Sequence, residues 1–175
     1  MTLWSTGPSQ LRNAKRDGSQ FHLQFREVLL HACVRERLIC PCYCLMPDHM
    51  HLLWMGLRRE TDQRKGMTFL RTYTEPLLAP CRYQAQPHDH VLGDDERRQG
   101  SFATHCAYVL QNPVRAKLVE CAQLWPHSGS MVPAYPKLHP HDKNFWDVFW
   151  KLYHQLREPD AASKRLLPRR STQRL

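Results

Sequence analysis

The sequence predicts a single domain of the α+β class. Residues 21–38 carry apolar side chains at three- and four-residue steps, which is typical of an amphipathic helix. The pattern becomes strand-like over 38–45 and 49–57, and helical spacing returns from Met67. A helix–strand–strand–helix order with few strands favours the α+β class. The 175 residues, 42% of them apolar, suffice for one buried core but not for two large domains.

A short turn separates the two strand-like runs. Pro47 and Asp48 are common turn residues, so we expect the runs to pair as a hairpin, although one strand interrupted by a bulge also fits. Residues Cys40, Cys42 and Cys44 recur at every second position, and on a regular strand they would share a face. We interpret them as core residues, because zinc thiolates usually come from C-x2-C spacings.

Proline and glycine divide the rest of the chain into helices and loops. The predicted elements are a helix over 67–78, a loop or edge strand over 82–100, a helix over 101–111, a long loop over 126–143 and an aromatic-rich helix over 145–156. Pro113 disfavours the helical conformation at the residue before it, so the helix that begins at Ser101 should end there. Asn112 can then cap a further turn that begins with Pro113.

The chain is basic, with a net charge of +9 and a pI of about 9.4, which suggests a polyanionic partner such as nucleic acid. The first 20 residues contribute +2 and the last 18 contribute +3, which leaves +4 for the middle. We expect a poorly ordered N-terminal segment (1–20), a folded domain that carries the function (21–157) and a basic disordered tail (158–175). Charge in such tails supports nucleic-acid binding only weakly.

Other sequence features bear on the cellular setting. Seven cysteines, an odd number, and no recognisable secretory signal indicate a reduced, cytosolic environment. No apolar run approaches the ~18–20 residues needed to cross a bilayer. Since no nucleotide-binding loop is recognisable either, we expect neither a membrane partner nor a nucleotide cofactor.

Three His-x-His pairs occur, at 49/51, 88/90 and 139/141. Only His49 and His51 open an apolar run that should form a rigid strand, on which residues i and i+2 point to the same face. Such a pair can hold a divalent ion, and the alternative is two half-exposed histidines without a ligand. Barrel hydrolases also use H-x-H, but a (β/α)8 barrel usually needs ~250 residues. A zinc hydrolase with Cys42 or Cys44 as further ligands is another alternative.

Six tyrosines are candidates for a nucleophile, and their spacing does not choose among them. Tyr108 lies four residues before Asn112, so on one helix the phenol and the amide oxygen would share a face and could converge on an ion. The alternative is a half-buried tyrosine on an amphipathic helix, with Asn112 acting only as a cap.

Two segments resemble the bacterial single-strand tyrosine transposases of the HUH type. Residues 43–54 (YCLMPDHMHLLW) are similar to the signature strand of that superfamily, and residues 108–119 (YVLQNPVRAKLV) are similar to its tyrosine helix. A weaker match, residues 88–92 (HDHVL), lies between them. Within the superfamily, the sequence looks most like the REP-associated tyrosine transposases, whose motif order it keeps over roughly residues 25–120.

The resemblance implies a ferredoxin-like sandwich, with an antiparallel sheet and helices on one face. It implies that His49 and His51, on a central strand, ligate Mg²⁺ or Mn²⁺, with Asn112 as the third ligand and Gln111 as the alternative. It also implies that Tyr108, on a helix beside the sheet, is the nucleophile. The cations expected to position the DNA backbone are Arg71, Arg115 and Lys117.

The implied activity is metal-dependent cleavage and rejoining of single-stranded DNA, as in DNA transposition, through a 5′-phosphotyrosine at hairpin-flanked sites. An ordinary tyrosine has a pKa near 10, so only about one in a thousand is phenolate at pH 7, and a divalent ion can act as Lewis acid and template. The expected partners are single-stranded DNA hairpins in the bacterial cytoplasm, at the nucleoid, and a homodimer is left open. The alternative is a catalytically decayed protein of the same fold that only binds hairpin DNA.

The sequence departs from the family in two places. The family usually starts with a strand before its first helix, whereas here only Thr2, Leu3 and Trp4 offer a fragment of strand. A missing strand would leave a sheet edge unpaired. Gly93 stands where the family commonly has an arginine. Both differences bear on activity and DNA affinity, and they leave the metal–tyrosine set whole.

Overall fold

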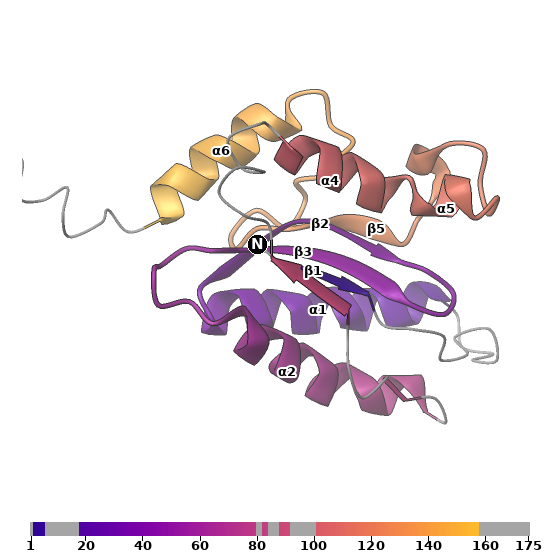
Figure 1. Ribbon diagram of the computed structural model, residues 1–175, viewed down its shortest axis with the longest axis horizontal. Coiled ribbons are helices and arrows are strands. Elements are labelled where there is room, and N and C mark those ends of the chain that lie inside the picture. Colours follow the sequence, from indigo (N-terminus) through magenta and orange to yellow (C-terminus); the bar gives the residue numbers. More distant parts are fainter. Residues whose placement is uncertain (1, 6–17, 80–81, 84–87, 92–100, 158–175) are drawn as a thin grey trace, which may run out of the picture.

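The structure is a computed structural model that describes residues 2–5, 18–79, 82–83, 88–91 and 101–157. A five-stranded antiparallel sheet in the order β4-β1-β3-β2-β5 lies between layers of helices (Figure 1). The strands are β1 (Thr2–Ser5), β2 (Leu38–Leu45), β3 (Met50–Gly56), β4 (His88–Val91) and β5 (Ser128–Met131). The helices are α1 (Gly18–Arg35), α2 (Gln63–Thr74), α4 (Ser101–Leu110), α5 (Asn112–Arg115) and α6 (Phe145–Leu156), with 3₁₀ turns η2 (Glu75–Leu78) and η3 (Ala122–Leu124).

Four strands and two helices form a ferredoxin-like core. The chain runs β1–α1–β2–β3–α2–β4, and β3 is inserted between β1 and β2 while β4 pairs with the other side of β1. This is the split βαβ arrangement repeated once. The predicted α+β class and antiparallel ferredoxin-like sheet are therefore confirmed.

The strands β2 and β3 form the predicted hairpin. Leu45 pairs with Met50, and the Met46 amide donates to the His49 carbonyl at 2.7 Å, which closes a tight turn around Pro47 and Asp48. The turn residues favour this connection because proline fixes its own φ and aspartate tolerates turn geometry. The hairpin places His49 directly before a central, buried strand.

A bulge in β2 changes which face its cysteines occupy. The pairing of β2 shifts by one residue between Ile39 and Cys42, where Pro41 interrupts the ladder, as prolines in sheets usually do only at bulges or edges. Cys40 consequently packs on the α1 side, whereas Cys42 and Cys44 pack on the α4 side. The expectation that all three share one face is wrong, although all three are buried core residues as predicted.

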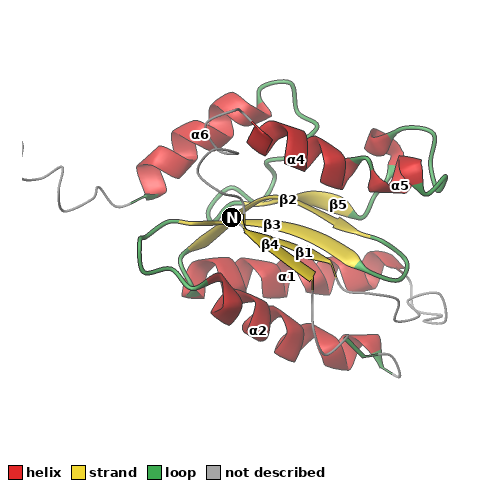
Figure 2. Ribbon diagram, viewed as in Figure 1, coloured by secondary structure: helices red, strands yellow, loops and turns green. Residues whose placement is uncertain are grey.

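Helices cover both faces of the sheet (Figure 2). α1 and α2 bury one face in a cluster that includes Phe25, Leu29, Leu70, Tyr43 and Trp54. α4 and α6 bury the other face in a second cluster that includes Phe102, Val109, Phe149, Ile39 and Leu53. The structure thus corrects the expectation of helices on one face, which holds for the ferredoxin-like core alone. Full burial of one such aliphatic or aromatic side chain contributes about 1.5–3 kcal/mol, so both layers stabilise the sheet.

Three local expectations differ from the structure. The segment expected to be poorly ordered contains β1, which pairs with β3 and β4, and α1 already begins at Gly18. The predicted loop over 126–143 contains β5. Gln111, not Asn112, is the N-cap residue of α5. Residues 6–17, Gly93 and the tail 158–175 lie outside the described residues.

No helix within the described residues is long and apolar enough to span a membrane.

Candidate functional site

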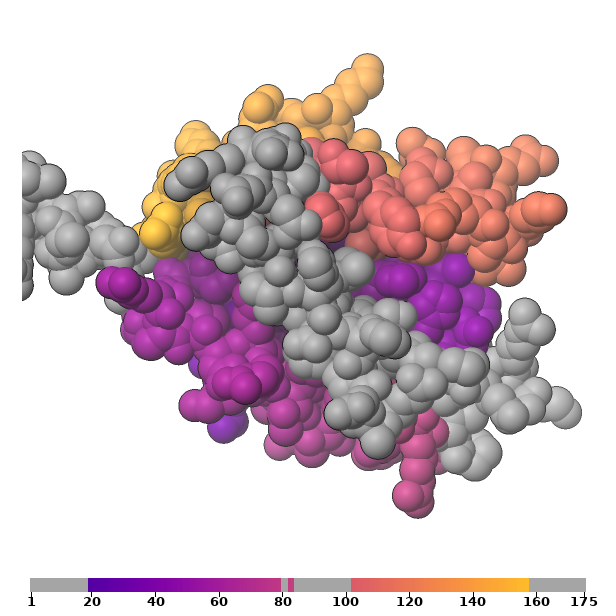
Figure 3. All heavy atoms as spheres, viewed as in Figure 1, coloured from indigo at the N-terminus to yellow at the C-terminus, as the bar shows by residue number. Residues whose placement is uncertain are grey.

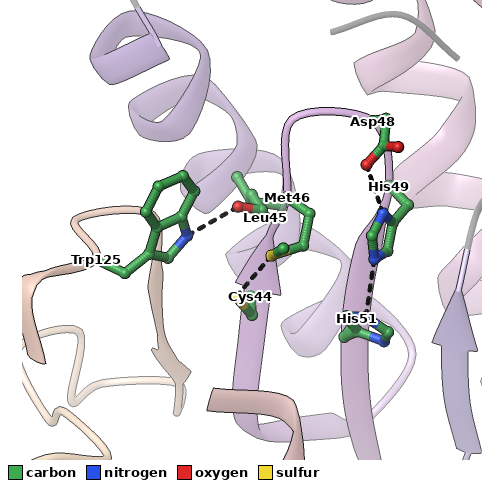
Figure 4. Close-up of polar contacts among 7 residues, drawn as sticks. All are labelled: Cys44, Leu45, Met46, Asp48, His49, His51 and Trp125. Carbon is green, nitrogen blue, oxygen red and sulfur yellow. Dashed lines mark hydrogen bonds and ion pairs between the residues drawn. The ribbon is translucent and has the colours of Figure 1, made fainter. Parts of the chain in front are cut away.

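The histidine pair lies on the sheet face that α4 covers. His51 belongs to β3, which pairs with both β1 and β2, so its position on a central strand is confirmed. Leu53, two residues further on, packs in the cluster beneath α4 and α6, and alternation along the strand places His51 on the same face. The His49 and His51 rings point toward one another, with their Nε2 atoms 3.0 Å apart (Figure 4).

This spacing fits a pair of ligands to one divalent ion. Two ligands at right angles and about 2.1 Å from an octahedral ion would themselves lie about 3.0 Å apart. The Nε2 atoms of His49 and His51 meet that spacing. Among the described residues, no set of three His, Cys, Asp or Glu side chains is placed to hold an ion.

The environment of His51 favours its neutral form. The residue is 8% exposed, and burial, with His49 and Arg115 as lesser causes, lowers the pKa of His51 to about 4. A neutral imidazole is the form that binds metal. His51 is thus neutral at physiological pH, as a ligand needs to be.

Tyr108 lies near the end of α4 and is 47% exposed. The guanidinium carbon of Arg115, in α5, lies 4.4 Å from the centroid of its ring. The same Arg115 contributes to the lowered pKa of His51, so its positive charge acts on both the tyrosine and the histidine pair. Arg115 therefore lies close enough to influence both parts of the predicted site, the tyrosine and the histidine pair.

Asn112 holds the junction between α4 and α5. Its side-chain Nδ2 donates to the carbonyl oxygens of Tyr108, at 3.0 Å, and of Val109, at 3.1 Å. These bonds fix the orientation of the amide, because only its nitrogen can donate to a carbonyl, and the amide oxygen must point away from α4. These bonds join the Asn112 side chain to the backbone of Tyr108 and not to its phenol. The convergence of the phenol and the amide oxygen on one ion stays a prediction, as does the choice between Asn112 and Gln111 as a metal ligand.

The three predicted DNA-contacting cations do not lie together. Arg115 and the exposed Lys117 lie in and just after α5, and Lys117 has a left-handed φ of 56°. In Figure 3 the coral atoms of the α4–α5 segment lie next to purple atoms of the sheet. Arg71 lies instead on α2, in the opposite helical layer, and its guanidinium carbon is 5.3 Å from the centroid of the Tyr83 ring.

Two residues around the hairpin were not identified from the sequence as parts of the site. The Asp48 carboxylate lies 2.6 Å from Nδ1 of His49, and the Trp125 indole donates to the Leu45 carbonyl at 2.9 Å (Figure 4). The sequence shows Asp48 only as a turn residue. Its position next to His49, a candidate ligand, is the signal that could have identified it.

The other two histidine pairs lie elsewhere. The backbone of the 88/90 pair forms β4 at the sheet edge. His139 and His141 lie in the loop after β5, with ring centroids 5.2 Å apart, and His139 Nε2 lies 3.3 Å from the Ser128 carbonyl. The preference for the 49/51 pair as the one on a rigid central strand is therefore consistent with the fold.

Comparisons with known proteins find a solved structure of the same fold and a relative in sequence. The fold is that of a solved transposase, described as "Structure of the REP associates tyrosine transposase bound to a REP hairpin", with a TM-score of 0.56 and 18% identity over 73% of this chain and 74% of that one. A Haemophilus influenzae protein named "Putative REP-associated tyrosine transposase" is 25% identical over an alignment of 134 positions that covers 68% of this chain and 74% of the relative. The resemblance to the REP-associated tyrosine transposases is thereby confirmed. No protein-family model matches the chain.

Proposed function

We propose that this protein cleaves and rejoins single-stranded DNA at hairpin-flanked sites, with His49 and His51 as metal ligands and Tyr108 as the nucleophile. The observation that carries the proposal is the 3.0 Å approach of the two Nε2 atoms on the face beneath the helix of Tyr108. The homologue named a tyrosine transposase supports the same reaction class.

Each proposed ligand suits Mg²⁺ or Mn²⁺. His49 and His51 supply two nitrogens, and Asn112, with Gln111 as the alternative, supplies an amide oxygen. When bound, the ion would neutralise charge on the phosphate and act as Lewis acid and template. Two histidines and one amide leave coordination positions for water and phosphate. The neutral state of His51 supports this role, since a protonated ring could not ligate.

Tyr108 carries the covalent step. Its phenol oxygen attacks the scissile phosphorus, an O–P bond forms, and the bond from phosphorus to the 3′ oxygen breaks. The phenol proton is lost and the departing oxygen is protonated, which gives a 5′-phosphotyrosine and a free 3′-OH. Attack by a 3′-OH reverses both changes, so rejoining needs no ATP. The exposed position of Tyr108 at the end of α4 supports access to a strand.

The proposed substrate is a folded single strand. The solved transposase with this fold is described as bound to a REP hairpin, which supports hairpin DNA as the partner here. Arg115, whose guanidinium lies over the Tyr108 ring, and Lys117, two residues later, would position phosphates near the nucleophile. Arg71 could meet only DNA that extends to the α2 layer. We place this activity at the bacterial nucleoid, with a homodimer as an assembly to be tested.

A strand-cleavage assay tests the proposal. The full chain, Mn²⁺ and labelled single-stranded hairpins from the DNA that flanks its own gene should give a shortened product with an extendable 3′-OH. His49→Ala and chelator should abolish the product, and His31→Ala, an exposed histidine of α1, should not. Hairpin binding without cleavage across several hairpins and both metals would overturn the enzymatic proposal in favour of a DNA-binding protein of the same fold.

A further inference from the structure

The two histidines of the pair have different surroundings. His49 lies against a carboxylate, with its Nδ1 2.6 Å from Oδ1 of Asp48. His51 is buried, and its Nδ1 has no hydrogen-bond partner among the described residues. The two rings meet through their Nε2 atoms at 3.0 Å. Each of these contacts constrains where a proton can be.

The carboxylate determines the proton position on His49. An ionised carboxylate has no hydrogen to donate, so a 2.6 Å contact with a ring nitrogen is attractive only when that nitrogen carries the proton. In its neutral form the His49 ring has one proton, so with Nδ1 protonated its Nε2 is bare. A bare Nε2 is the form of histidine that ligates a metal.

The position of the proton on His51 follows from the contact between the two rings. Two bare nitrogens at 3.0 Å would repel, so one of the Nε2 atoms must donate. With both rings neutral, His49 is bare there and His51 supplies the hydrogen, so the buried Nδ1 of His51 is then a bare nitrogen. An ion can reach both nitrogens only after His51 has lost the proton on Nε2 and gained one on Nδ1, with no change in net charge.

We propose that Asp48 is a positioning residue: its carboxylate holds the His49 proton on Nδ1, so that His49 presents a bare Nε2 while His51 carries its proton on Nε2 until an ion binds. The proposal rests on the proposed metal site. It makes His49 the ligand that is ready before the ion arrives and His51 the ligand that must change tautomer. Asp48 acts through His49 and touches neither the ion nor the DNA.

Nitrogen NMR of the metal-free protein tests the proton positions directly. Long-range ¹H–¹⁵N spectra of the ¹⁵N-labelled full chain at pH 8 distinguish a protonated from a bare ring nitrogen. His49→Gln and His51→Gln variants assign the two rings. We expect the proton of His49 on Nδ1 and that of His51 on Nε2. A proton on Nε2 of His49 in the wild-type protein would overturn the proposal.

Two substitutions of Asp48 test its role by Mn²⁺ titration calorimetry. Asp48→Ala should weaken Mn²⁺ binding about 10- to 100-fold and let His49 populate both tautomers. Asp48→Asn keeps an acceptor oxygen and the turn preference, so it should have a smaller effect of the same sign. Asp147→Asn, at an exposed position of α6, removes the same charge and should change neither readout.

The outcomes separate this inference from the proposed reaction. Unchanged tautomers and Mn²⁺ affinity in Asp48→Ala would overturn the role of Asp48, even if the protein cleaves DNA. The expected tautomers and affinity order in a protein that cleaves no DNA would support the role of Asp48 and overturn the reaction. A wild-type protein that binds no Mn²⁺ would overturn both.

Discussion

The guanidinium carbon of Arg115 lies 4.4 Å from the centroid of the Tyr108 ring. The proposed nucleophile on α4 therefore lies against a cation at the end of the next helix, α5. A cation over an aromatic face contributes about 0.5–1 kcal/mol at an exposed site, which is small enough for a phosphate to compete for the same guanidinium. Arg115 can therefore restrain Tyr108 in the free protein and contact the DNA backbone in the complex.

Arg115→Gln should weaken hairpin binding and reduce the salt dependence of that binding. Loss of one phosphate contact lowers the slope of log K against log salt by about 1. Fluorescence anisotropy with a labelled hairpin at several salt concentrations measures the slope. Lys151→Gln, at an exposed position of α6, is the matched control. Equal slopes for Arg115→Gln and the wild-type protein would show that Arg115 does not contact the DNA backbone.

Both His49 and His51 should be required for binding of the ion. His49→Ala and His51→Ala each leave a single imidazole, so we expect Mn²⁺ binding to fall by at least about 100-fold, or about 2.7 kcal/mol, in titration calorimetry. His31→Ala should bind as the wild-type protein does. Stoichiometric zinc in the purified protein, retained against a chelator and lost in both variants, would favour the zinc-hydrolase alternative instead.

The stability of the fold should fall in mild acid because of His22. Burial, with His127, Arg26 and His139 as further causes, lowers the pKa of His22 from its usual 6.5 to about 4. The Arg26 guanidinium donates to the Tyr43 hydroxyl at 2.6 Å, which leaves that hydroxyl to donate to His22 Nε2 at 2.8 Å. Between pH 6.5 and 4 the unfolded chain therefore takes up a proton that the folded ring does not.

The sign of this effect follows from proton uptake by the unfolded state, which makes the free energy of unfolding decrease as the pH falls through that window. We expect a contribution on the order of 1 kcal/mol, after allowance for the partial exposure of the ring. Urea unfolding at pH 7 and pH 4.5 measures it. His22→Gln should reduce the difference between the two pH values, and the exposed His31→Gln should leave it as in the wild-type protein.

Gly66 should not tolerate alanine, although alanine normally favours a helix by about 1 kcal/mol. A Cβ at this position of α2 would overlap Cδ1 of Leu38 and lie 3.2 Å from the Trp54 ring, and both side chains are fully buried. We expect Gly66→Ala to destabilise the fold by about 1–3 kcal/mol, as overpacking does. Lys65→Ala, an exposed neighbour, should be neutral in the same unfolding experiment.

Local patterns were sufficient to predict much of the fold. β2 coincides with the predicted strand and α6 with the predicted helix, because their apolar spacing reflects their burial. β5 was missed because Ser128, Gly129 and Ser130 have weak strand preferences, and only pairing with β2 makes them a strand. The bulge at Pro41 and the second helical layer also depend on packing that no local window contains.

The same distinction applies to the candidate site. The context of His49 and His51, at the start of an apolar strand, predicted that the two side chains would lie on one face, and their Nε2 atoms lie 3.0 Å apart. Tyr108 was chosen by resemblance, since the spacing of the tyrosines did not discriminate. The contact of Asp48 with His49 depends on the side-chain conformations in the turn, and the contact of Arg115 with Tyr108 depends on the angle between α4 and α5. Neither can be derived from a residue pattern.

The most direct test of the proposed function is to identify the residue that becomes joined to DNA. The full chain would be incubated with Mn²⁺ and a labelled hairpin substrate, denatured, digested with trypsin and examined by mass spectrometry beside Tyr108→Phe. The account predicts a denaturant-resistant adduct on the peptide that contains Tyr108, absent from Tyr108→Phe, although that variant still binds the hairpin. An adduct on a different residue, or one that persists in Tyr108→Phe, would contradict it.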